Sequence, residues 1–82
     1  MKLPVIRQIQ RSTSAEDIEV AIRVLENTSE ATSLKEEELE VIGELISNMC
    51  GAMEVHELIK EGMAEKDALN TFMKKVMSSI DR

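Results

Sequence analysis

The chain has 82 residues, with ten Lys and Arg against sixteen Asp and Glu, so its formal net charge is −6. This length predicts one small domain, and a core this small often needs oligomerisation for stability. Hydrophobic residues make up 43% of the chain, which argues against wholesale disorder. Phe72 is the only aromatic residue, which argues against nucleic-acid binding by base stacking.

The sequence predicts a cytoplasmic protein. Residues 1–7 include two basic residues but do not lead into an apolar stretch of signal-peptide length. No apolar run approaches the ~18–20 residues that a membrane span requires. The single cysteine, Cys50, cannot form a disulfide within the chain, which is typical of a reducing compartment.

Charge is distributed unevenly along the chain. Residues 16–65 contain fourteen acidic and three basic residues, a net charge of −11, whereas residues 1–15 carry +3 and residues 66–82 carry +2. This pattern predicts contacts between the basic ends and the acidic middle, within one chain or between two copies. It argues against DNA binding, because a DNA footprint needs a continuous basic face.

Residues 14–28, 34–61 and 65–80 show helical periodicity, which predicts an all-α fold with three main helices. Ser14 with Asp17, and Ser33 with Glu36, resemble capping boxes at the first two starts. Gly62 is placed to end the long central helix, which would then form an antiparallel hairpin with the C-terminal helix. Residues 1–12 fit either a short helix or an extended arm.

The long helix carries an apolar seam with alternating steps of three and four residues, which is a heptad pattern. Its members are Leu39, Ile42, Ile46, Met49, Met53 and His56. Further apolar residues flank this seam, so the apolar arc needs more than one neighbouring helix to cover it. We therefore predict a helical-bundle homodimer with the seam as its interface.

Small residues recur every four positions on another face of the same helix, at Gly43, Ser47 and Gly51. They indicate either close approach of another backbone or an exposed face that weakens the helix. The sequence leaves both alternatives open.

Two groups of side chains are candidates for metal binding or for a reactive thiol. Met49, Met53 and His56 share a helix face, and thioether and imidazole ligands suit Cu(I), although the same positions fit a core seam better. Cys50 has no base within one helical turn, so a plain buried or half-buried cysteine is favoured over a reactive thiol. No catalytic or cofactor-binding motif is recognisable, so we expect neither enzyme activity nor a cofactor.

Three segments, MKLPVIR, SLKEEELEVIGELISNM and ALNTFMKKVMSSID, together resemble a family of small, uncharacterised bacterial proteins that opens with MKLPVI. The resemblance spans nearly the whole chain. The resemblance implies a cytosolic, all-helical, single-domain protein. Because the family has no established activity, the resemblance assigns no function to any residue of this sequence.

The leading hypothesis is a non-enzymatic interaction or accessory protein that assembles with itself and with another protein through a Met-rich helical surface. The first alternative is a redox or metal accessory protein that uses Cys50 or the Met49, Met53 and His56 face. The weakest alternative is docking to RNA or a ribosome through the basic ends. No membrane partner is expected.

Overall fold

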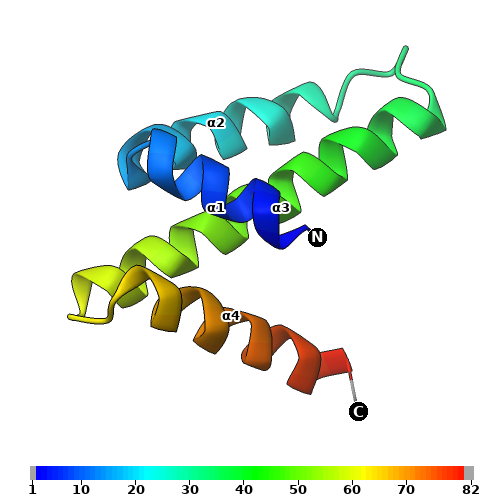
Figure 1. The fold of residues 1–82 in the computed structure, drawn as a ribbon. Helices are drawn as coiled ribbons and strands as arrows, with labels where there is room; N and C mark the ends of the chain where they lie inside the picture. Colours follow the sequence, from blue (N-terminus) through cyan, green and yellow to red (C-terminus); the bar gives the residue numbers. More distant parts are fainter. Residues whose placement is uncertain (1, 81–82) are drawn as a thin grey trace.

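The computed structural model describes the backbone of residues 2–80 and the side chains of residues 2–77. Within that range the chain forms four α-helices and no strand (Figure 1), so the all-α prediction is confirmed. The helices are α1 (Leu3–Ser12), α2 (Ala15–Thr28), α3 (Glu36–Lys60) and α4 (Glu65–Ile80). Their bounds lie within two residues of those predicted.

The N-terminal segment is a helix, which settles the choice between helix and extended arm. Pro4 lies in the first turn of α1, where its missing N–H costs no hydrogen bond. The amides of Val5 and Ile6 both donate to the carbonyl of Lys2, and Ile6 is fully buried. Helical spacing gathers Ile6 with the half-buried Leu3 and Ile9 around the core.

Local capping explains why α2 begins where it does. The hydroxyl of Ser14 accepts a hydrogen bond from the amide of Asp17 at 3.2 Å, as the capping-box pattern predicts. At the other end, the hydroxyls of Thr28 and Ser29 donate to the carbonyls of Val24 and Glu26. The helix ends at Thr28, with Ser29 as its C-cap residue.

The predicted start of α3 at Ser33 is wrong. The helix begins at Glu36, with Lys35 in extended conformation as its N-cap residue. The carboxylate of Glu38, not that of Glu36, reaches back to accept from the Lys35 amide at 2.9 Å. Four glutamates in close succession made several cap registers available, and the backbone turns within residues 27–34 precede the later one.

Gly62 ends α3 as predicted. Its φ of +109° lies in the left-handed region that glycine adopts without a steric penalty. Its amide donates to the carbonyl of Ile59, and the amide of Met63 donates to that of Leu58. This pair of bonds is a Schellman motif, which turns the chain sharply into α4.

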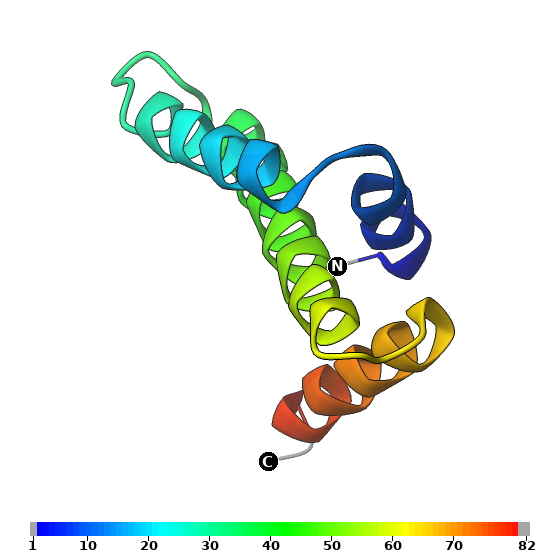
Figure 2. The same cartoon turned by 90° about the vertical axis from the view of Figure 1, so that its left-hand side faces the viewer.

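The four helices form a flat, open array around α3 instead of a closed bundle (Figures 1 and 2). Helix α2 packs along the N-terminal half of α3, α1 packs against the C-terminal half from Asn48 onward, and α4 folds back against the C-terminal part and then diverges from it. The molecule measures 43 × 32 × 17 Å. Its radius of gyration is 13.7 Å, whereas about 12 Å is typical for this length.

The core lies where α1, α2 and α4 meet the C-terminal half of α3. It consists of Ile6, Ile18, Ala52, Val55, Ala68, Leu69 and Phe72. The polar side chain of Asn48 is also buried, and its Oδ1 accepts from the Lys2 amide at 2.9 Å. This bond ties the start of α1 to the middle of α3 and satisfies an N–H in the first turn.

The recurring small residues on α3 divide into two cases. A Cβ on Gly51 would lie 2.9 Å from Cζ of Phe72 and 3.0 Å from Cδ1 of Ile6, so α1 and α4 approach α3 closely there. A Cβ on Gly43 would meet nothing within 4 Å. Close packing is therefore confirmed for Gly51, whereas Gly43 only weakens the helix.

These two glycines give a matched pair of substitutions. We expect Gly43→Ala to raise the free energy of unfolding by about 0.5–1 kcal/mol through helix propensity alone. Gly51→Ala gains the same propensity but overpacks the core, at a cost of about 1–3 kcal/mol, so we expect a net loss. Urea unfolding of both variants tests this, and a Gly51→Ala protein as stable as Gly43→Ala would contradict it.

Candidate functional site

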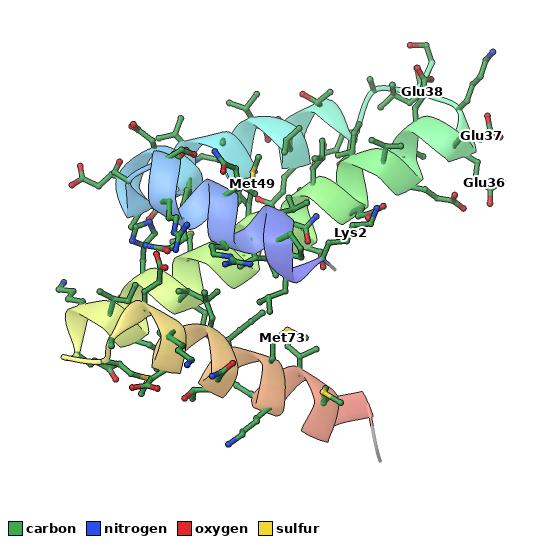
Figure 3. The ribbon with its side chains drawn as sticks, viewed as in Figure 1. Lys2, Glu36, Glu37, Glu38, Met49 and Met73 are labelled. Atoms are coloured by element: carbon green, nitrogen blue, oxygen red, sulfur yellow. The ribbon has the colours of Figure 1, made fainter. Side chains whose placement is uncertain are left out.

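A shallow depression lies at the free end of α3, which projects beyond α1 and α4 (Figure 1). We call it the acidic depression. It measures about 430 Å³ and is lined by Leu34, Glu37, Glu38, Val41 and Ile42. Figure 3 shows Glu36, Glu37 and Glu38 together at this end, far from α1 and α4. An apolar floor with carboxylates around it suits a partner with apolar and basic side chains.

The floor of this depression continues the buried stripe of α3. Val41 and Leu45 precede Asn48, Ala52 and Val55 at steps of four, three, four and three, so all five share one face. The last three are buried, but Val41 is 57% exposed and Leu45 is 38% exposed. The same face is therefore core in one half of α3 and surface in the other.

A second hollow separates α1 from α4, and we call it the basic groove. It measures about 400 Å³ and is lined by Leu3, Arg7, Arg11, Glu65, Lys66, Leu69 and Asn70. Three cations and one carboxylate give these residues a net charge of +2, on a chain whose net charge is −6. The groove therefore attracts anionic groups, while Leu3 and Leu69 offer apolar contact.

The carboxylate in the basic groove is already neutralised. Arg11 holds Glu65 through Nε and Nη2, with distances of 2.6–3.1 Å to the two carboxylate oxygens. The hydrogen bonds from Arg11 lower the pKa of Glu65, and the same contact raises the pKa of Arg11. The charge of Arg7 also lowers the pKa of Glu65. Arg7 and Lys66 thus supply the cationic character of the groove.

The contacts predicted between the basic ends and the acidic middle are present within the chain. Arg11, near the N-terminus, pairs with Glu65, and Lys75, in α4, pairs with Glu54 of α3 at 2.7 Å. The Lys75 pair borders a smaller hollow of about 170 Å³ between α3 and α4. Both pairs are largely exposed, so they orient the helices more than they stabilise them.

The three residues considered for Cu(I) are engaged inside the chain. Met49 and Met53 pack against the core, and Figure 3 places Met49 between α2 and α3. Nε2 of His56 lies 2.8 Å from the carbonyl oxygen of Thr13, so this nitrogen must be a donor and cannot coordinate a metal in this arrangement. His56 thereby ties the junction of α1 and α2 to α3.

Cys50 is exposed, so the expectation of a buried or half-buried cysteine is wrong. Its neighbours one turn before and after, Ile46 and Glu54, are both only half-buried. The Cys50 thiol therefore lies on a solvent-facing part of α3. Within the described residues, no group of three or more His, Cys, Asp and Glu side chains is placed to hold a metal ion.

The predicted interface seam is split by the fold. Its C-terminal part, from Met49 to His56, makes contacts within the chain, whereas Leu39 is 39% exposed and Ile42 lines the acidic depression. Sequence reasoning missed Val41 as a surface residue and Arg7 with Lys66 as a groove. The signal for Val41 was its spacing from Leu45 and Ala52, but nothing local links Arg7 to Lys66.

The described residues form a small, open, all-helical protein with an acidic depression at one end of α3 and a basic groove between α1 and α4. The helices of residues 2–80 include none that combines the length and apolarity needed to cross a bilayer. A family model matches residues 1–81, and the chain belongs to that family, a family of unknown function (DUF6952). No curated protein and no solved structure matches it.

The Arg11–Glu65 contact gives a testable pH dependence. Because the pKa of Glu65 is lowered in the folded state, the contact stabilises the fold above the usual carboxylate pKa of about 4.3. That contribution is lost as the pH falls through the lowered value. We expect Arg11→Gln to raise the pKa of Glu65 toward its usual value, as measured by NMR titration of the side-chain carboxyl carbon. Arg23→Gln on α2 is the control and should leave this pKa unchanged.

Proposed function

We propose that this chain is a non-enzymatic interaction protein that works as a homodimer. The observation that carries the proposal is the exposed continuation of the core stripe at Val41 and Leu45. Residues on this face are buried wherever a neighbouring helix reaches them. A second copy would bury the remaining part and complete the core that one chain leaves open.

The size of the exposed surface supports this proposal. The chain exposes 5877 Å², whereas a folded monomer of 9.2 kDa is expected to expose about 4,900 Å². The excess of about 1,000 Å² is close to the ~800 Å² that each partner buries in a stable interface of standard size. One symmetric contact would therefore bring the exposed area per chain to that of an ordinary compact protein.

The proposed interface keeps part of the seam that the heptad pattern predicts. Leu39 and Ile42 remain available at the free end of α3, and Val41 and Leu45 from the neighbouring stripe join them. The rest of the seam is used within one chain instead: Met49 and Met53 pack against the core, and His56 is hydrogen-bonded to Thr13. The metal alternative gains no support from this arrangement, because Met49 and Met53 pack against the core and one imidazole nitrogen of His56 is occupied by the Thr13 carbonyl.

The test replaces apolar side chains that already face solvent in one chain. We expect wild type to be a dimer at micromolar concentration, and Val41→Glu with Leu45→Glu to convert it to a monomer of unchanged helix content. Burying two carboxylates against a partner is costly, whereas leaving them in solvent is not. Sedimentation equilibrium and far-ultraviolet circular dichroism provide the two measurements.

The matched control uses valines of similar exposure on α2. Val20 and Val24 are 52% and 56% exposed, and they lie on the outer face of α2, opposite the buried Ile18. We expect Val20→Glu with Val24→Glu to leave the dimer intact. A monomeric wild type, or a dimer that only the α2 pair disrupts, would refute the proposed function.

A further inference from the structure

The second copy also needs a surface to receive the free end of α3, and the basic groove has the required charge. The free end presents Glu37 and Glu38 around an apolar floor. The groove presents Arg7 and Lys66 around Leu3 and Leu69. Each surface has the charge that the other lacks, and each has an apolar centre about which charged groups are arranged.

The positions of the two surfaces along α3 fit a symmetric contact. The acidic depression lies at the N-terminal end of α3, and the groove lies beside its C-terminal half (Figure 1). A two-fold axis perpendicular to α3 makes the two copies antiparallel, so unlike ends would meet twice in the same dimer. A parallel arrangement would instead bring the glutamates of both copies together.

Helix geometry sets the register of this contact. Suppose that the two antiparallel α3 helices cross near Leu45, where the two-fold axis of the dimer passes. A residue eight positions before Leu45 then lies about 12 Å along the helix from this axis. It is level with the residue eight positions after Leu45 in the partner. Glu37 would thus lie level with the partner's Met53. Beside the C-terminal half of α3, Ile6 of α1 packs over Gly51, and the next residue of α1, Arg7, lines the basic groove.

We propose that the basic groove of each chain binds the acidic end of α3 from a second copy, with Glu37 facing Arg7 in two equivalent contacts. This inference rests on the homodimer proposed above and assigns its orientation and its receiving surface. A net charge of −6 makes two copies repel each other overall. The local attraction of groove and depression overcomes that repulsion in one orientation only, so it specifies the partner as well as the geometry.

A charge swap tests the contact. We expect Arg7→Glu and Glu37→Lys each to weaken the dimer dissociation constant about tenfold or more, because each change places like charges together twice per dimer. An equimolar mixture of the two variants should form a heterodimer in which both contacts pair unlike charges. Native mass spectrometry distinguishes this heterodimer from either homodimer by mass.

Rescue by mixing separates a direct contact from damage to one chain, because a misfolded Arg7→Glu protein would not be restored by Glu37→Lys. Glu36→Lys is the control for the second change, since it alters charge in the same first turn of α3 but lies outside the depression. Arg23→Glu, on α2, is the control for the first. Both control variants should dimerise as wild type does.

The possible outcomes distinguish the two proposals. Loss of the dimer in each single variant with recovery in the mixture supports the groove contact, and weakening of the wild-type dimer in molar salt supports it further. If Val41→Glu with Leu45→Glu abolishes the dimer but the charge variants do not, the groove contact is wrong and the homodimer stands. Homodimers of both variants without preferential heterodimer formation would also overturn the groove contact. A monomeric wild type overturns both proposals.

Discussion

The packing of short helices against one long helix is the constraint on which the rest of this structure depends. Helix α3 has 25 residues, whereas α1 has 10 and α4 has 16. At about 1.5 Å per residue, neither reaches along the whole of α3, and both gather at its C-terminal half. The core forms there, with Gly51 allowing α1 and α4 close access. The other half of α3 has only α2 beside it, so an apolar stripe continues into solvent.

The charged residues are also distributed unevenly between the two halves of α3 and the helices around it. Arg11 and Lys75 draw the basic ends onto the acidic middle through Glu65 and Glu54. Glu37 at the acidic end of α3, and Arg7 and Lys66 in the basic groove, lie outside these two pairs. The surfaces that expose apolar side chains also carry unbalanced charge, and both features favour association with a partner. The absence of aromatic residues other than Phe72 is consistent with an interface built from aliphatic side chains.

Much of the fold could be predicted from local patterns. Local signals set most of the helix bounds: Ser14 caps the start of α2, and Gly62 ends α3. These signals involve only residues a few positions apart, so they do not depend on how the helices pack. Where several residues could cap the same helix, the predicted helix start was wrong by a few residues. The start of α3 is the example, because Glu38 and Glu36 offered alternative caps. Exposure of Cys50 was missed for a different reason, since it depends on which faces of α3 its neighbours cover.

The sequence by itself determined that this protein is helical, that α3 is long, and that its apolar arc is too wide for one neighbour. It also determined that the chain's ends and middle carry opposite charge. Only the tertiary structure decided which stripe of that arc is buried and where burial stops at Leu45. It alone brought Arg7 and Lys66 together across 59 positions of sequence to form a groove. Periodicity specifies a helix face, but contacts between distant segments decide whether that face meets another helix or water.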